Sequence, residues 1–176
     1  MVKAEYWTQL HYAARDNSTA IAHLLIDEGA QIDAVDNFGY APLHLAASWD
    51  SLEVARLLIE NGADKQLSAE ELWTPLHDAA WNNSRHVARL ILEFGAEFDT
   101  RDEAGETTPH VAASKDSTGV ARLLIKNVAE VTEKLGDLQE KMKKLKDVPG
   151  TAPKNVTNAL FVGSTAELQK MLKGRT

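Results

Sequence analysis

The chain has 176 residues, of which 44% are hydrophobic and 26% are charged, and its formal net charge at pH 7 is −7. This composition indicates a folded globular protein that can bury a sizeable core, rather than a disordered or fibrous chain. The negative charge argues against nucleic acid or an anionic membrane surface as a partner, because both attract basic surfaces. Because the chain has no cysteine, it can form neither disulfides nor thiolate metal sites.

The sequence also argues against membrane insertion and secretion. No apolar run approaches the roughly 20 residues that span a bilayer, and the first residues do not have the basic-then-apolar pattern of a signal peptide. We therefore expect a soluble protein in the cytoplasm, with no membrane partner. Sequons for N-glycosylation begin at Asn17, Asn82 and Asn155. We interpret them as chance occurrences, because they would matter only in a secretory compartment.

A seven-residue motif recurs four times at a constant spacing. Its copies are TQLHYAA from Thr8, APLHLAA from Ala41, TPLHDAA from Thr74 and TTPHVAA from Thr107, so each copy starts 33 residues after the previous one. A second pattern, which reads IAHLLIDEGA in the first copy and VARLLIENGA in the second, follows each motif in the same register. This period and the T-P-L-H-x-A pattern resemble the ankyrin repeat over about residues 3–134.

The resemblance implies an all-α fold, an ankyrin-type α-solenoid of stacked helix-turn-helix repeats with finger-like turns between them. Such a solenoid has a concave face that binds other molecules. We place the repeats at about 3–35, 36–68, 69–101 and 102–134, and we expect a C-terminal helical extension after them.

The residues of the third repeat support this fold independently. Thr74 can cap a helix through its hydroxyl, and Pro75 suits the first helical position, where a missing N–H is no loss. Leu76, Ala79 and Ala80 then form an apolar stripe on one face of that helix.

Two recurring turn positions complete the repeats. Glycine follows the second helix in three copies, where a helix end commonly needs a left-handed residue; these are Gly29, Gly62 and Gly95. The turn between the two helices, where ankyrin repeats often have glycine, carries Asn17, Asp50, Asn83 and Asp116. Asparagine and aspartate tolerate a positive φ better than other residues with a side chain, so we expect the turn to be kept.

The first and fourth repeats depart from the pattern. Repeat one has Gln9 in place of the motif's proline and Tyr6 in place of the finger glycine, which predicts an incomplete finger. Repeat four has Thr108 and Pro109 where the others have a proline and a core leucine. We therefore expect the first helix of repeat four to be shifted or distorted.

The end of repeat four lacks a stop signal, since Val128 stands where the first three repeats have glycine. Apolar residues then recur at heptad spacing as far as Leu145, which favours a single helix over about 118–147. A helix that stops near Val128 stays open as an alternative, because residues 129–131 still match the loop of a normal repeat. Gly136 also counts against a long helix, by about 1 kcal/mol relative to alanine.

We divide the rest of the chain into an amphipathic helical extension at 128–147, a linker at 148–155 and a helical pair at 156–173. The helical pair is interpreted as a cap over the last repeat or as a partial repeat. The helix from Val128 to Leu145 is also a candidate surface for self-association, since an uncovered heptad stripe is an adhesive patch.

The sequence shows no catalytic or metal-binding pattern. Four histidines recur at the repeat period, but neighbouring helices lie about 8–10 Å apart and zinc–nitrogen bonds measure about 2 Å. We interpret these histidines, His11, His44, His77 and His110, as hydrogen-bonded to the backbone between repeats. The acidic groups fall on exposed fingers, whereas general acid catalysis needs a desolvated carboxyl. We therefore expect a protein that is not an enzyme and has no metal and no cofactor.

The aromatic residues indicate a binding surface. At about 100° per helical residue, Trp49 and Trp81 point away from the core stripe on neighbouring helices. In ankyrin-like proteins, such outward residues and the finger tips line the concave groove. Exposed aromatics beside an acidic rim are typical of a protein interface, with packing inside the chain as the alternative. The predicted partner-binding residues are Phe38, Tyr40, Ser48, Trp49, Glu70, Glu71, Trp73, Asp78, Trp81, Asn82, Glu103 and Lys115.

The sequence thus predicts a non-catalytic protein–protein interaction module that holds a protein partner in its concave groove. One alternative is a regulatory or inhibitory ankyrin protein that assembles through its C-terminal helices. Another is an engineered ankyrin binder, although irregular repeats such as TTPH count against an idealised design.

Overall fold

The computed structural model describes the backbone of residues 6–146 and the side chains of residues 6–141. Within that range the chain forms helices and loops, with an isolated bridge between Arg101 and Thr107. The all-α prediction is therefore confirmed. The predicted linker at 148–155, the predicted helical pair at 156–173 and most of the finger of repeat one lie outside the described residues.

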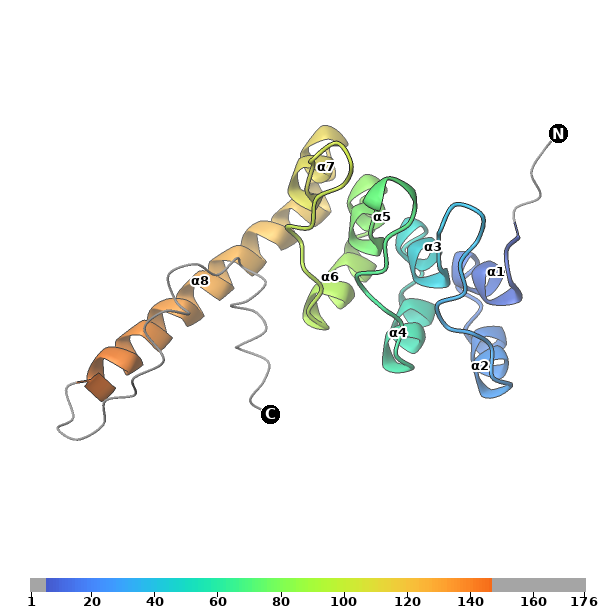
Figure 1. Cartoon of the computed structure of the whole chain (residues 1–176), viewed down its shortest axis with the longest axis horizontal. Helices are drawn as coiled ribbons and strands as arrows, with labels where there is room; N and C mark the ends of the chain where they lie inside the picture. Colours follow the sequence, from blue (N-terminus) through green and yellow to red (C-terminus); the bar gives the residue numbers. More distant parts are fainter. Residues whose placement is uncertain (1–5, 147–176) are drawn as a thin grey trace. The chain divides into compact units, whose positions relative to one another are not determined.

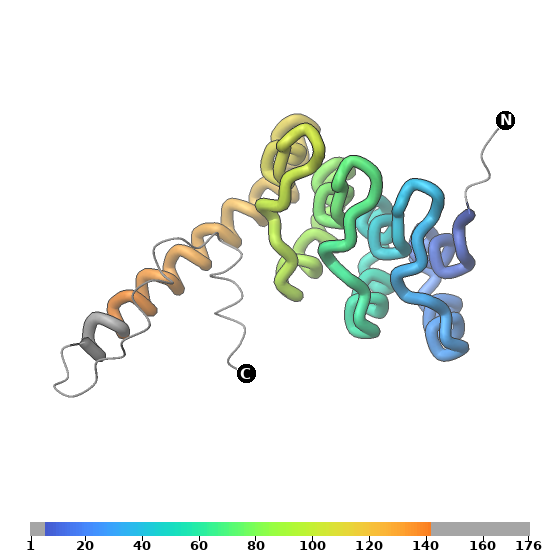
Figure 2. Tube along the Cα trace, viewed as in Figure 1, coloured from blue at the N-terminus to red at the C-terminus, as the bar shows by residue number. Residues whose placement is uncertain are grey.

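The helices come in pairs, as the repeat predicts (Figure 1). They are α1 (Gln9–Arg15), α2 (Thr19–Asp27), α3 (Pro42–Ser48), α4 (Leu52–Glu60), α5 (Pro75–Trp81), α6 (Arg85–Glu93), α7 (Thr108–Ser114) and α8 (Thr118–Lys146). In the first unit of the chain, Met1–Leu124, the first helices of the repeats form one row and α2, α4 and α6 form a second row. The fingers follow one another along this stack (Figure 2), and the finger before α5 contains the short 3₁₀ helix η1 (Glu70–Leu72).

The second unit of the chain is Ile125–Thr176. Helix α8 runs without a break from Thr118 to Lys146, so of the two alternatives at the end of repeat four the structure has the continuous helix. Ile125, Val128 and Leu138 of this helix are exposed. Self-association through it stays a prediction.

The expectation of a shifted or distorted first helix in repeat four is wrong. Helix α7 begins at Thr108 with Thr107 as its N-cap, in the same register as α5 with its N-cap Thr74. Pro109 is the second residue of α7, where the backbone N–H has no acceptor within the helix, so its loss removes no hydrogen bond. Pro109 is exposed, whereas Leu76 at the equivalent position of α5 is buried.

The recurring histidines fix the first helices and connect successive repeats. Nδ1 of His11 accepts the backbone N–H of Thr8 at 3.1 Å. The Nε2 of His11 donates to the carbonyl of Tyr40 at 2.9 Å, and that of His44 donates to the carbonyl of Trp73 at 3.1 Å. Burial lowers the pKa of His44 to about 4, which keeps the ring neutral with one donor and one acceptor nitrogen. The predicted backbone contacts between repeats are confirmed for these two histidines.

Ala41 offers a stabilising substitution, because it stands where the other three motifs have threonine. In all four motifs the backbone N–H of this residue donates to the histidine Nδ1. In the three threonine motifs the hydroxyl also lies 2.7–2.8 Å from that nitrogen, and Ala41 lacks it. We expect Ala41→Thr to raise the free energy of unfolding by about 1 kcal/mol, as measured by chemical denaturation. Ala41→Val is the control, because valine has a similar shape without the hydroxyl. An equal gain from valine would contradict the hydrogen-bond explanation.

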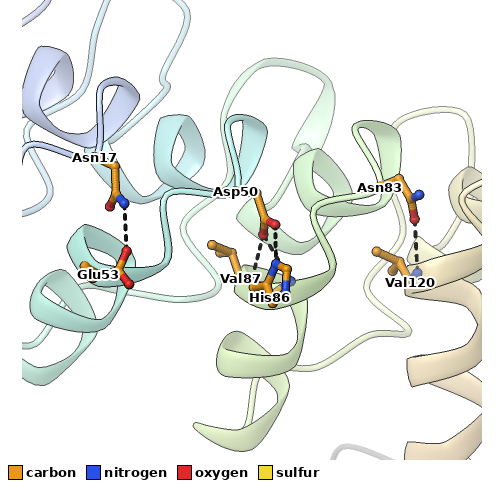
Figure 3. A network of polar contacts seen from close by, with 7 residues as sticks. All are labelled: Asn17, Asp50, Glu53, Asn83, His86, Val87 and Val120. Carbon is orange, nitrogen blue, oxygen red and sulfur yellow. Dashed lines mark hydrogen bonds and ion pairs between the residues drawn. The ribbon is translucent and has the colours of Figure 1, made fainter.

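The turn residues between paired helices link each repeat to the next (Figure 3). The φ angles are 50° for Asn17, 52° for Asp50, 55° for Asn83 and 53° for Asp116, so the predicted positive φ is confirmed. The Asp50 carboxylate also accepts the backbone N–H groups of His86 and Val87, at 3.0 and 2.9 Å, where α6 begins. These groups have no acceptor inside their own helix. The side chains of Asn17 and Asn83 cap α4 and α8 in the same way, through the N–H groups of Val54, Gly119 and Val120.

Substitutions at Asp50 separate the effect of its positive φ from the effect of its hydrogen bonds to the start of α6. Asp50→Gly keeps the positive φ but removes the cap, so we expect it to lower the free energy of unfolding by about 1 kcal/mol. Asp50→Ala also removes the cap but, unlike glycine, keeps a Cβ in the left-handed region, so we expect it to be about 1–2 kcal/mol less stable than Asp50→Gly. Denaturant titration of both variants measures the difference. Equal losses would show that the positive φ has no role at this turn.

Candidate functional site

An open cavity of about 560 Å³ lies within the first unit of the chain, and we refer to it as the groove pocket. Three consecutive repeats contribute to it. Repeat one supplies the residue before Thr8, the N-cap of α1. Repeat two supplies its finger and the C-terminal part of α3, and repeat three supplies α5. The lining residues are Trp7, Asp36, Phe38, Tyr40, Leu45, Ser48, Trp49, Asp78, Trp81 and Asn82. The pocket is therefore a product of repeat stacking, because no single repeat contains it.

Asp36 shapes the finger that forms one wall of the groove pocket. Its Oδ1 accepts the backbone N–H groups of Phe38 at 2.9 Å and of Tyr40 at 3.0 Å. Its Oδ2 accepts the indole N–H of Trp7 at 3.0 Å, which joins repeat one to the finger of repeat two. The Asp36 carboxylate thus receives three donors from the protein itself, and these bonds position aromatic side chains in the wall.

Trp49 and Trp81 are the most exposed aromatic residues of the pocket, at 55% and 49% of their surface. The Trp81 ring meets the Trp73 ring edge to face, with 5.7 Å between centroids. The Nζ of Lys115 lies 3.2 Å from the Trp81 centroid, so one indole of this surface already binds an ammonium group through a cation–π contact. Trp81 is therefore held in place by neighbours while half of it faces solvent.

Asp78 is a buried carboxyl group in the groove pocket, with 7% of its surface exposed. Its Oδ1 accepts the hydroxyl of Ser48 at 3.2 Å, whereas its Oδ2 has no hydrogen-bond partner in the described part of the chain. Burial raises the pKa of Asp78 to about 8, against the opposing effects of Ser48 and Trp73. At neutral pH most of this carboxyl is therefore protonated. Helical geometry predicted that the Asp78 side chain points outward. Asp78 does line the pocket, but α3 packs against α5 and buries the Asp78 side chain.

Acidic groups lie around Tyr40 in the wall of the pocket. Burial raises the pKa of the Tyr40 hydroxyl to about 12, and the carboxylates of Asp78, Asp36, Glu70 and Glu71 add to the rise. A negative surrounding disfavours a further negative charge on the phenol. The same surrounding attracts positively charged groups.

Seven of the twelve predicted partner-binding residues line the groove pocket. They are Phe38, Tyr40, Ser48, Trp49, Asp78, Trp81 and Asn82. Of the other five, Trp73 and Lys115 contact Trp81, while Glu70, Glu71 and Glu103 lie on the next two fingers. Backbone hydrogen bonds join these fingers, from Glu70 N–H to the Phe38 carbonyl at 2.8 Å and from Glu103 N–H to the Glu71 carbonyl at 2.9 Å. The acidic rim therefore continues from the pocket along the fingers.

Sequence reasoning did not select three lining residues, Trp7, Asp36 and Leu45. Asp36 had a usable signal, because aspartate stands three residues before a finger glycine both there and at Asp102. Leu45 also had a signal, because helical geometry puts it on the same side of its helix as Ser48 and Trp49.

Among the residues that the structure describes, no cluster of three or more histidine, cysteine, aspartate or glutamate side chains is placed to hold a metal ion. Within the same residues, no helix is long and apolar enough to cross a membrane.

Comparison with known families identifies the repeat. The family model described as ankyrin repeats (3 copies) matches residues 1–69 and 68–135. The chain therefore belongs to the ankyrin repeat family. Members of this family are generally non-catalytic modules for protein–protein interaction. Comparison with curated proteins gave no match.

Proposed function

We propose that the chain binds a protein partner in the groove pocket, with Trp49 and Trp81 as anchors. The observation that carries the proposal is the presence of two half-exposed tryptophans on one 560 Å³ cavity. Leaving large apolar surface in water is unfavourable, and contiguous exposed patches of this kind mark interaction sites. Tryptophan is also among the residues most enriched at binding hot spots.

The charges around the pocket support a partner of complementary sign. Glu70, Glu71 and Glu103 are exposed on consecutive fingers beside it, so a partner with basic residues around an apolar anchor suits this surface. Binding is the whole mechanism, and no bond is made or broken. Location in the cytoplasm and self-association through α8 remain predictions.

Affinity capture tests this function. The full chain, the double variant Trp49→Ala with Trp81→Ala, and the variant Phe94→Ala are immobilised, and captured proteins are identified by mass spectrometry. Phe94 is the control, because it is an aromatic residue with 41% exposure at the end of α6, outside the pocket. We expect proteins that are captured by the wild type and by Phe94→Ala and lost with the double variant. Capture that is equal for all three would contradict a role for the pocket.

A further inference from the structure

Repeat one exposes apolar side chains at positions that the next repeat buries. Tyr12 of α1 and Ile21 and Leu24 of α2 are exposed, at 46%, 51% and 57% of their surface, and we refer to these three residues as the head face. The equivalent residues of repeat two are at most 7% exposed, because α1 and α2 pack against α3 and α4. They are Leu45, Val54 and Leu57. Terminal repeats of a solenoid usually have a polar outer face, so the head face has the character of a contact between repeats.

Repeat four exposes the opposite side of such a contact. Pro109, His110 and Ala113 of α7 are exposed, and so is Asp116 in the turn that follows; we refer to these four residues as the tail face. The residues of α5 that are equivalent to the first three are all 0% exposed, because α7 packs against α5. They are Leu76, His77 and Ala80.

Two kinds of polar contact recur where one repeat meets the next. In the first, a histidine Nε2 donates to a finger carbonyl of the next repeat, as His11 does to Tyr40 at 2.9 Å. In the second, a turn side chain accepts the first N–H groups of the next repeat's second helix. Asp50 accepts those of His86 and Val87 in this way (Figure 3).

The tail face has the histidine and the turn carboxylate of these contacts, in His110 and Asp116. Because Nδ1 of His110 accepts the Thr107 N–H at 3.2 Å, Nε2 is the nitrogen left to donate. The described residues contain no fifth repeat with a carbonyl or helix start for these two side chains.

Repeat one has the matching groups. The carbonyl of Trp7 is equivalent to that of Tyr40, and the N–H groups of Ala20 and Ile21 are equivalent to those that Asp50 accepts. The N-cap of α2, Ser18, makes no side-chain hydrogen bond to the helix. The end of the stack at repeat one therefore lacks the acceptor and the donor that the tail face has.

These polar groups favour a contact between unlike ends. Two head faces would bring two sets of N–H donors and two positive helix ends together, and two tail faces would bring two Asp116 carboxylates together. A tail face on a head face gives each donor an acceptor, and it places Asp116 at the positive end of α2.

We propose that a second copy of the chain stacks its tail face on the head face, in the register of one further repeat. The contact goes beyond the partner binding proposed above and does not use Trp49 or Trp81. Because its two sides differ, the contact is heterologous, and association continues past a dimer unless the rotation closes a ring.

Sedimentation velocity of the full chain over a wide range of concentration tests this proposal, with one variant for each face. Leu24→Glu places a charge on the head face, and Ala113→Glu places one on the tail face. Both residues are exposed, so the fold should tolerate the exchange. Phe94→Glu is the matched control, because Phe94 is an apolar residue with 41% exposure that belongs to neither face. Circular dichroism checks the helix content of each variant.

We expect the mean mass of the wild type and of Phe94→Glu to rise with concentration. Leu24→Glu and Ala113→Glu should each associate at least about tenfold more weakly. Their mixture should form a dimer of one chain of each variant, because the tail face of Leu24→Glu and the head face of Ala113→Glu are intact. A wild type that stays monomeric would overturn the proposal. Association of either variant alone with wild-type strength would also overturn it, because it indicates a contact between like ends or through another surface such as α8.

Asp116 tests the register of the contact. Asp116→Gly keeps the positive φ of 53° but removes the carboxylate, so self-association should weaken by about fivefold. Asp116→Asn keeps an acceptor oxygen, like the one with which Asn83 caps α8, and should associate almost as strongly as the wild type. Equal association of wild type and Asp116→Gly would overturn the proposed register.

Discussion

Asp78→Asn is expected to make the protein more stable than the wild type at pH 7, with a difference that disappears near pH 4. The pKa of Asp78 is about 8 in the folded protein, against an ordinary value of 3.8 for aspartate. Below pH 4 both folded and unfolded chains hold the proton. Between pH 4 and pH 8 the folded chain keeps the proton and the unfolded chain loses it. Folding then takes up a proton, so the free energy of unfolding falls as the pH rises.

The size of this effect follows from the linkage between protonation and folding. One proton corresponds to about 1.4 kcal/mol per pH unit, so the loss between pH 4 and pH 7 is on the order of 4 kcal/mol. Asparagine does not titrate, and its side-chain oxygen can still accept the Ser48 hydroxyl that Asp78 accepts at 3.2 Å. The buried histidines titrate in both proteins and cancel in the difference.

Urea denaturation at pH 4, 5.5, 7 and 8.5 measures this difference. Asp78→Leu is the second variant, because Leu45 shows that leucine fits the equivalent place. It should be at least as stable as Asp78→Asn at pH 7. A difference between wild type and Asp78→Asn that stays constant with pH would show that Asp78 is ionised in the folded chain, contrary to the burial argument.

Trp81→Ala is expected to weaken binding of a partner by about 30-fold or more, which corresponds to about 2 kcal/mol. Trp81 is already held by Trp73 and Lys115, at 5.7 and 3.2 Å from its ring centroid. A side chain that is ordered before binding loses little entropy when the partner arrives. Trp49 is the C-cap residue that follows α3 and is 55% exposed, so we expect a smaller loss from Trp49→Ala.

The two variants should also differ in stability. Trp81→Ala removes an aromatic contact and a cation–π contact, each worth about 0.5–1 kcal/mol, while Trp49→Ala should cost less than about 1 kcal/mol. Isothermal titration calorimetry with a captured partner and thermal unfolding measure the two effects separately. Large destabilisation by both variants with unchanged affinity would show that the tryptophans serve packing within the chain.

The repeat period was enough to predict the architecture, because each unit uses the same local chemistry. Thr74 and Pro75 begin a helix for reasons contained in a few residues, and the positive φ of Asn83 follows from its place in the turn. The contacts of that same side chain with α8 were not predicted, since its acceptor oxygen meets N–H groups 36 and 37 residues away. Such contacts depend on how one repeat stacks on the next.

The groove pocket was predictable in outline and not in its electrostatics. Helical geometry was enough to put Trp49 and Trp81 on one surface, as the pocket lining confirms. It could not give the burial of Asp78, because α3 of the preceding repeat covers that face of α5. Pro109 illustrates the opposite error, since a residue that looked disruptive stands in a helical turn that needs no N–H.

The central claim is that a protein partner occupies the groove pocket, and NMR of the four indole N–H groups tests it most directly. When the full chain is titrated with a captured partner, the indole resonances of Trp49 and Trp81 should shift, in proportion to the bound fraction. Unchanged indole resonances, with backbone shifts confined to α4 and α6 or to the part of α8 after Leu124, would contradict the account.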